Sequence, residues 1–203
     1  MISSKLIHNG PTTGLIRYWT GRFFLWLFSW DVVGRFPKDK KFIIITAPHT
    51  SNWDFPLGIL AIYIYRLKCS WIGKDSLFKK PFGVFMRWLG GIAVNRDSQH
   101  GVVDQIAKQF RESIKLAIAI APSGTRKKGN SWKSGFYWMA HKAQVPIVCA
   151  YFDYKRRETG IGLSFIPTGN VKMDMDRIRE FYKLFQAKHQ DMITPIRLKD
   201  EDA

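Results

Sequence analysis

A histidine and an aspartate stand five residues apart, between two apolar runs, in the stretch APHTSNWDFP at residues 47–56. An imidazole can accept a proton from a hydroxyl group near neutral pH, and a carboxylate on its other ring nitrogen fixes the tautomer and supports the imidazolium. If a helix begins near Trp53, Asp54 lies in its first turn and can face back toward His49. The spacing therefore predicts a general base with an acidic partner, although an aspartate there also complements the helix dipole.

No nucleophilic side chain accompanies this pair in the sequence. There is no GxSxG motif, and Cys69 and Cys149 lie in or beside apolar runs without CxxC spacing, which is typical of buried, reduced thiols. The histidines form no ligand-spaced cluster, so we predict no metal site. The pair is therefore expected to activate a hydroxyl group of the substrate itself, without a covalent enzyme intermediate.

The elements that must position this pair alternate along the chain. Short apolar runs predict strands at residues 41–48, 69–74, 91–96, 115–122, 145–154 and 160–167, the last antiparallel to its predecessor. Amphipathic or apolar segments predict helices at residues 55–67, 81–89, 100–113, 133–143 and 173–189. This alternation predicts an α/β fold, a single layered domain with a mostly parallel central sheet flanked by helices.

Ligands of such sheets collect at the carboxyl ends of the strands. Four polar residues stand at or just past such an end, each after a different predicted strand: His49, Lys74, Arg96 and Arg126. Beside the last, Gly124 permits close approach to a ligand, Thr125 offers a hydroxyl and an amide, and the guanidinium matches phosphate bidentately. A phosphate clamp is one interpretation of this Gly-Thr-Arg sequence, and an ordinary turn with an exposed arginine is the other.

The N-terminal segment LIRYWTGRFFLWLFSWDVVGRF, residues 15–36, is dense in Trp and Phe. Charged residues and a glycine interrupt it, so its apolar stretches are shorter than the ~20 residues that a spanning helix needs. Aromatic rings with flanking arginines suit the lipid headgroup boundary. We predict a helical membrane-interface segment within residues 1–36, followed by the catalytic domain at residues 37–203. A core-packing helix and a single membrane span are the alternatives.

A net charge of +16 and a pI near 10.0 predict a positive field that attracts phosphate-bearing partners. Nucleic acid, anionic lipid and a phosphorylated substrate all meet that description. The stretch RKKGNSWK at residues 126–133 mixes basic and aromatic residues as a single-strand binder would, but no nucleic-acid-binding signature accompanies it. We therefore predict no nucleic-acid partner, and peripheral or monotopic association with the cytoplasmic face of a membrane.

Four sequence blocks then carry a family resemblance: HTSNWD, GKDSLF…PFG…GGIAVNR, APSGTR and VPIV. In this order and at these intervals, across about residues 42–150, they resemble the motif blocks of the glycerophosphate/lysophosphatidate acyltransferase family. The resemblance implies transfer of a fatty acyl group to the hydroxyl of a lysophospholipid-like acceptor, 1-acylglycerol-3-phosphate or a related lipid. The implied donor is an acyl-CoA or an acyl-carrier-protein thioester, which acts as co-substrate, and no cofactor is implied.

The same resemblance assigns roles to individual residues. His49 becomes the general base and Asp54 its partner, while Pro146 matches a proline associated with acyl-donor binding or loop shape. The residues that match the phosphate-binding positions are Lys74, Arg96, Gly124, Thr125 and Arg126. An esterase that hydrolyses phosphate-containing lipids is the alternative function for such a pair.

One departure from the family pattern matters. The third block usually reads Phe-Pro-Glu-Gly-Thr-Arg, whereas this chain has Ser123 where the glutamate stands. The pocket therefore lacks a carboxylate beside its phosphate-binding residues, which makes it more positive and removes a hydrogen-bond acceptor. This departure makes acceptors with another headgroup, or an aminolipid precursor, admissible.

We therefore expect Ser123→Glu to change acceptor preference. The added carboxylate should favour lysophosphatidate over a lysolipid with a larger headgroup, which a comparison of kcat/KM for the two acceptors measures in both proteins. If the ratio of the two kcat/KM values is the same in both proteins, Ser123 does not set specificity.

Overall fold

The computed structural model describes residues 8–94, 99–199 and 201, with residues 99 and 100 described by their backbone alone. The strands are β1 Asp31–Val33, β2 Lys41–Ala47, β3 Ser70–Lys74, β4 Gly91–Val94, β5 Leu116–Ile120, β6 Ile147–Asp153 and β7 Glu158–Phe165. The α-helices are α1 Leu15–Leu27, α2 Asp54–Ile64, α3 Gly83–Trp88, α4 Gln99–Glu112, α5 Gly135–Ala143 and α6 Val171–Tyr182. Two short 3-10 helices, η1 Asp75–Phe78 and η3 Gln190–Met192, complete the described elements that we use below.

The described strands form one 7-stranded sheet in the order β1-β7-β6-β2-β5-β3-β4. Adjacent strands of this sheet pair in parallel, except that β6 and β7 are antiparallel. The predicted α/β fold with a mostly parallel sheet is therefore confirmed, and so is the antiparallel pairing of the strand that follows β6. Parallel strands need crossover connections, and the helices supply them.

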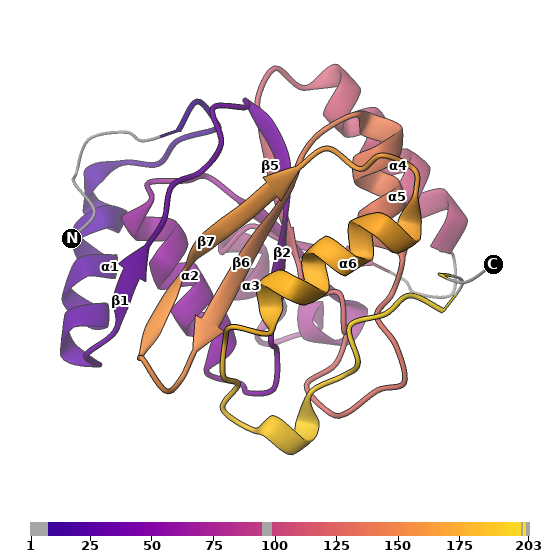
Figure 1. Cartoon of the computed structure of the whole chain (residues 1–203). Helices are drawn as coiled ribbons and strands as arrows, with labels where there is room; N and C mark the ends of the chain where they lie inside the picture. Colours follow the sequence, from indigo (N-terminus) through magenta and orange to yellow (C-terminus); the bar gives the residue numbers. More distant parts are fainter. Residues whose placement is uncertain (1–7, 95–98, 200, 202–203) are drawn as a thin grey trace.

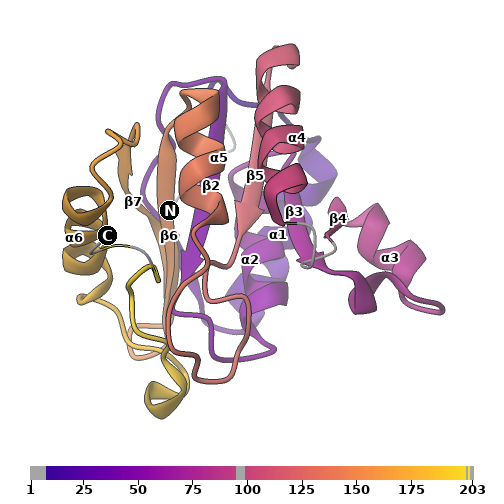
Figure 2. The same ribbon diagram turned by 90° about the vertical axis from the view of Figure 1, so that its right-hand side faces the viewer.

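Strand β2 shows why the sheet is covered on both faces. Phe42 and Ile44 belong to a buried cluster with residues of α1 and α2, whereas Ile43 and Ile45 belong to a second cluster with residues of α4, α5 and α6. A continuous apolar strand buries alternate side chains in each layer. Figure 2 shows the result: α4 and α5 lie in front of the sheet, α1 and α2 lie behind it, and α3 lies beyond its β4 edge.

The segment at residues 15–36 contains two elements, whereas we predicted one helical segment. Helix α1 ends at Leu27, and the chain turns through Ser29, which has a φ of 54°. It then enters β1, which pairs in parallel with β7. Gly34 ends this strand with a φ of 88°, and a Cβ there would lie 2.0 Å from the carbonyl oxygen of Ile161. The predicted boundary at residue 36 thus falls after a strand of the main sheet.

Helix α1 has one packed face and one exposed face. Tyr18, Gly21 and Leu25 are buried against the α2 layer, whereas Trp19 and Trp26 are 62% and 72% exposed. The helix is 13 residues long, and the described part of the chain has no helix with the length and apolar character needed to cross a membrane.

The last long helix is shorter than we predicted, because α6 ends at Tyr182 and not at His189. The Tyr182 hydroxyl donates to the carbonyl oxygens of Ile45 and Ala150 at 2.9 and 3.0 Å, which ties the helix end to the sheet. Phe185 then stacks on Tyr151 with ring centroids 3.6 Å apart. These tertiary contacts end the helix where no glycine or proline marks a stop.

The close packing of α1 on α2 depends on Gly21. A Cβ at this position would lie 2.7 Å from the carbonyl oxygen of Leu60, closer than side-chain carbons approach a backbone atom. We expect Gly21→Ala to lower the free energy of unfolding by about 1 kcal/mol or more, because overpacking outweighs the gain of about 1 kcal/mol in helix propensity. Chemical denaturation measures this change.

The matched control is Gly101→Ala in α4, where an added Cβ meets nothing within 4 Å. Only helix propensity acts there, so this variant should be as stable as the wild type or more stable. An equal gain in stability at both positions would contradict the packing argument.

Candidate active site

The sequence from β2 to α2 builds the centre of the site. Strand β2 ends at Ala47, a short loop carries His49, and α2 begins at Asp54, as the spacing predicted. Asp54 faces back along the loop, and its Oδ2 lies 2.9 Å from Nδ1 of His49. His49 keeps 17% of its side chain exposed, whereas Asp54 is 2% exposed. The base is therefore accessible from solvent and its partner is enclosed.

Four donors surround the Asp54 carboxylate. Oδ2 accepts hydrogen bonds from the backbone N–H groups of Thr50 and Ser51, each at 2.9 Å, in addition to the contact with His49. Oδ1 accepts a hydrogen bond of 2.5 Å from the hydroxyl of Tyr154. Because an ionised carboxylate only accepts, Nδ1 of His49 carries the proton in this arrangement. Nε2 then keeps its lone pair free to take a proton from a substrate.

Tyr154 is a site residue that our sequence reasoning missed. It follows β6, its ring packs edge-on against Trp30 with centroids 5.0 Å apart, and the Lys188 amino group lies 5.9 Å from the ring centroid. Burial and the hydrogen bond to Asp54 raise the pKa of Tyr154 above its ordinary value, so its hydroxyl stays protonated and donates. The signal was present in the sequence, because Tyr154 ends a predicted strand just as His49 follows one.

The strand register brings four carboxyl ends to one edge of the sheet, the lower edge in Figure 1. Ile45 of β2 pairs with Ile120 of β5, and Lys74 of β3 pairs with Val94 of β4. The carboxyl ends of β2, β3 and β5 therefore lie on the same side of the sheet, as predicted. This places His49, Lys74 and the 121–129 loop on that side, and Lys74 is exposed there. Arg96, which we predicted as a phosphate ligand, lies outside the described residues.

The loop after β5 forms a tight turn that presents an arginine. Gly124 has a φ of 65°, and its N–H donates to the carbonyl oxygen of Ala121 at 3.0 Å. The Ser123 hydroxyl donates to the carbonyl oxygen of Thr125 at 2.9 Å, and the Thr125 hydroxyl accepts from the Lys127 N–H at 3.2 Å. Arg126 is exposed and forms no ion pair with any residue that the structure describes. Its guanidinium is therefore available to an anionic ligand.

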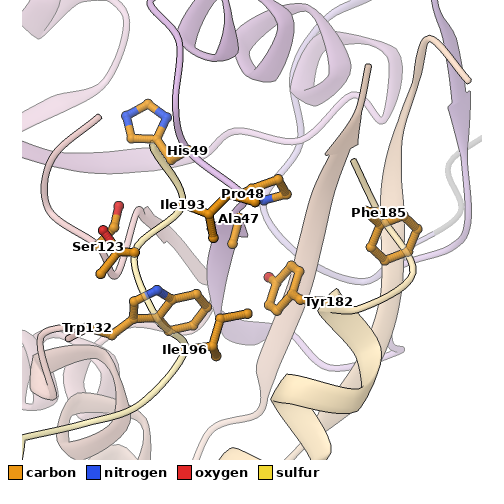
Figure 3. Close-up of a pocket in the computed structure, with 10 residues that line it drawn as sticks. Ala47, Pro48, His49, Ser123, Trp132, Tyr182, Phe185, Ile193 and Ile196 are labelled. Atoms are coloured by element: carbon orange, nitrogen blue, oxygen red, sulfur yellow. The ribbon is translucent and has the colours of Figure 1, made fainter. Parts of the chain in front are cut away.

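A small cavity of about 40 Å³ connects the first and third blocks (Figure 3). Both His49 and Ser123 line it, together with Trp132 and Tyr182. The structure thus brings the predicted base and the predicted specificity residue to one cavity. A volume of this size holds a water molecule and not an acyl chain, so the long parts of a lipid substrate would lie along the open edge.

The C-terminal segment at residues 183–198 braces both loops of the site, which the sequence did not predict. The backbone N–H of His189 donates to the Thr50 hydroxyl at 3.2 Å, beside the base. The Thr194 hydroxyl accepts from the Gly129 N–H at 2.9 Å, at the end of the third-block loop. This segment therefore connects the loop after β2 with the loop after β5.

Pro146 is not brought to this edge. It precedes β6, it is buried, and its carbonyl oxygen accepts from the Ile43 N–H at 3.0 Å. Strand geometry of ~3.3 Å per residue places it roughly 15–20 Å from the end of β2, near the opposite edge of the sheet. Any effect of Pro146 on acyl-donor binding must therefore act through the shape of the sheet or through its connections.

The two thiols and the potential metal ligands lie apart from this site or from one another in the described part of the chain. Cys69 and Cys149 are free, and burial raises the pKa of each thiol to about 12, which keeps both protonated. No group of three or more His, Cys, Asp or Glu side chains among the described residues is arranged to hold a metal ion.

The fold and site together define an α/β protein with a partly exposed His–Asp pair at the carboxyl ends of parallel strands. Comparison with known proteins specifies the family. The chain belongs to the acyltransferase family, whose model, described as Acyltransferase, matches residues 31–153. This match includes the His49 loop, the turn at Arg126 and the strand before Tyr154, and it leaves out α1.

Two curated relatives and one solved structure are similar to the chain. The 1-acyl-sn-glycerol-3-phosphate acyltransferase of Haemophilus influenzae is 31% identical over 150 residues, 69% of this chain and 60% of the relative. The human 1-acyl-sn-glycerol-3-phosphate acyltransferase beta is 27% identical over 184 residues, 84% of this chain and 64% of the relative. The chain thus spans less than two thirds of the length of either relative.

The solved structure is the crystal structure of the 1-acyl-sn-glycerophosphate (LPA) acyltransferase PlsC from Thermotoga maritima. It matches with a TM-score of 0.54 and 22% identity, and the match covers 86% of this chain and 81% of that chain. This similarity confirms the fold over most of the chain.

The hydrogen bond from Tyr154 should orient the Asp54 carboxylate. We expect Tyr154→Phe to lower the kcat of acyl transfer about tenfold with little change in KM, because Oδ1 loses its donor and the carboxylate can rotate away from Nδ1. The low-field proton NMR resonance of the His49 Nδ1–H should shift or broaden as well. Steady-state kinetics and proton NMR measure the two effects.

Tyr151→Phe is the matched control, because Tyr151 lies in β6, three residues before Tyr154, and its hydroxyl also donates to a carboxylate, that of Glu158. This variant should change stability without changing kcat or the His49 resonance. If Tyr154→Phe behaves in the same way as Tyr151→Phe, Tyr154 does not position the catalytic pair.

Proposed function

We propose that this protein transfers a fatty acyl group from an acyl-CoA or acyl-carrier-protein thioester to the hydroxyl of a lysophosphatidate-like acceptor. The observation that carries the proposal is the His49–Asp54 pair, whose geometry leaves Nε2 of the imidazole free at the open edge of the sheet. Membership of the acyltransferase family supports the reaction class. The names of the two curated relatives support a glycerophosphate acceptor.

The chemistry follows from the tautomer. Nε2 of His49 accepts the proton of the acceptor hydroxyl while the hydroxyl oxygen attacks the thioester carbonyl carbon. A new C–O ester bond forms, the C–S bond breaks, and the imidazolium returns the proton to the departing thiolate. Asp54 supports the imidazolium through the contact with Nδ1, and general-base assistance of this kind contributes ~10²–10⁴ in rate.

The acceptor phosphate would lie between the loops that follow β3 and β5. Arg126 presents a guanidinium that suits two phosphate oxygens at once, and Lys74 adds a second exposed positive charge on the same side of the sheet. Gly124 lets the loop approach the ligand closely. Arg96 belongs to this set by the resemblance of the second block. A bound phosphate would hold the acceptor hydroxyl near His49, which lowers the entropic part of the barrier.

Association with a membrane surface is part of the same proposal, because a lysophosphatidate-like acceptor is an amphipathic lipid that partitions into bilayers. The outer face of α1 exposes Ile16, Trp19, Phe23 and Trp26, a composition that suits the headgroup boundary. We propose peripheral association on the cytoplasmic face, with the positive charge of the protein attracted to anionic lipids.

Removal of the base tests the proposal. His49→Ala should fold normally and lose at least ~10²-fold of acyl transfer to lysophosphatidate, because the acceptor hydroxyl loses its proton acceptor. Release of CoA from acyl-CoA, with and without lysophosphatidate, measures the reaction. The control is His189→Ala, an exposed histidine of the neighbouring segment, which should keep its activity.

Two results would overturn the proposal. Retained transfer in His49→Ala would exclude the His–Asp mechanism. Release of CoA from the wild type at the same rate with and without acceptor, and without formation of an acylated lipid, would identify a thioester hydrolase.

A further inference from the structure

Two elements carry most of the large hydrophobic side chains that are exposed in the described part of the chain. Helix α1 and the residue after it expose Leu15, Ile16, Trp19, Phe23, Phe24, Trp26, Leu27 and Phe28. The unit of η1 and α3 exposes Leu77, Phe82, Val84, Phe85 and Trp88. Exposed apolar surface of this extent marks an interaction site.

The η1–α3 unit is a rigid part of the fold. Phe78 is buried and stacks on Trp71 with ring centroids 5.5 Å apart, which fixes the unit to β3. A Cβ at Gly83 would lie 1.9 Å from the Phe78 carbonyl oxygen, so the start of α3 packs directly on η1. The Arg87 guanidinium donates to the same oxygen at 3.2 Å. These contacts fix the backbone of α3, and the side chain of Val84 is 72% exposed on it.

Helices α1 and α3 belong to one surface. A groove of about 510 Å³ opens between them over α2, and Leu15, Ile16 and Trp88 supply apolar walls. The Arg17 guanidinium lies 5.3 Å from the ring centroid of Tyr63 in α2 and 5.7 Å from that of Trp88 in α3. One arginine thus contacts aromatic rings of both neighbouring helices. Figure 2 shows α1 behind the sheet and α3 beyond its β4 edge.

The same surface reaches the catalytic loop at its other end. Phe28, just past the end of α1, packs edge-on against Trp53 with ring centroids 5.9 Å apart. Trp53 is half exposed and immediately precedes Asp54. The Lys188 amino group lies 5.8 Å from the Trp53 ring centroid. A continuous series of contacts therefore runs from α3 through α1 to the loop that carries His49.

The charges beside this surface are predominantly positive. Helices α1 and α3 contain Arg17, Arg22 and Arg87 and no acidic residue. Lys79 and Lys80 are exposed where η1 leads into α3, and Asp75 is the one acidic residue of the η1–α3 unit. Aromatic rings with flanking cations are the composition that an anionic bilayer surface attracts.

We propose that the η1–α3 unit is a second membrane contact, which inserts Phe82, Val84 and Phe85 into the headgroup region of an anionic bilayer while α1 inserts beside it. This inference rests on the proposed function, because a lipid acceptor places the protein at a bilayer. A single helix leaves the protein free to roll about the helix axis. Two contacts on different elements fix the tilt, with the His49 loop at the border of the inserted surface.

Fluorescent probes at single positions test the proposal in the whole 203-residue chain. We would label Val84→Cys with an environment-sensitive dye, in a Cys69→Ser background because Cys69 is the more accessible native thiol. Ile16→Cys reports on α1, and Ile114→Cys, 79% exposed in the loop before β5, is the control. Vesicles of phosphatidylcholine with and without phosphatidylglycerol supply the membrane. We expect the Val84 and Ile16 probes to shift to the blue with the anionic vesicles, and the Ile114 probe to stay unchanged.

The outcomes separate this inference from the proposed function. A shift at Ile16 without one at Val84 would overturn the second contact and leave α1 as the membrane element. A Val84 shift that needs no vesicles and grows with protein concentration would identify a contact between two copies, and would also overturn it. Because the probe reports no catalysis, a Val84 shift in a protein without acyl transfer would support the membrane contact while the proposed reaction fails.

A charge substitution gives a second measurement. Val84→Glu should weaken binding to the anionic vesicles about tenfold in a sedimentation assay, whereas Ile114→Glu should change it less than twofold. Activity on a water-soluble, short-chain acceptor should stay the same in both variants, because neither residue belongs to the site. Equal binding by Val84→Glu and Ile114→Glu would contradict the inference.

Discussion

The buried carboxylate of Asp54 is the constraint on which the arrangement of the site depends. A charge that is 2% exposed is costly unless every oxygen is hydrogen-bonded. The donors come from the loop after β2 and from the residue after β6, so the carboxylate joins segments that are 100 residues apart. Both segments must be folded for the two oxygens of the Asp54 carboxylate to be hydrogen-bonded. The contact between His49 and Asp54 therefore depends on the folded sheet.

The sequence contained the local part of this arrangement. A continuous β-branched run predicts a strand covered on both faces, and β2 is such a strand. The spacing of five residues predicts that an aspartate in the first helical turn faces the histidine, and the 2.9 Å contact has that origin. Both signals arise from backbone geometry within one short stretch of chain, where periodicity is informative.

The parts that the sequence did not predict depend on distant contacts. The contact of Tyr154 with Asp54 depends on the pairing of β6 with β2, and the position of Tyr154 at the end of a predicted strand was the one sign of it in the sequence. The end of α6 at Tyr182 follows from hydrogen bonds to two strands. Strand β1 is only three residues long, and its conformation depends on the backbone hydrogen bonds that it makes with β7. In each case a tertiary partner decides the outcome, and propensity is a weak guide.

Helix α1 shows why composition alone did not decide between the membrane interface and core packing. Membrane interface and core packing were alternatives for one aromatic segment, but a helix of period 3.6 has room for both, with Gly21 on the packed face and Trp19 on the exposed one. The family match begins at residue 31, after this helix. The matched region thus contains His49 and Asp54, while α1, Tyr154, α6 and the segment after α6 lie outside it. Helix α1 and the region that the family model matches are therefore different parts of the chain. The contact between Phe28 and Trp53 is where the two parts meet, one residue before Asp54.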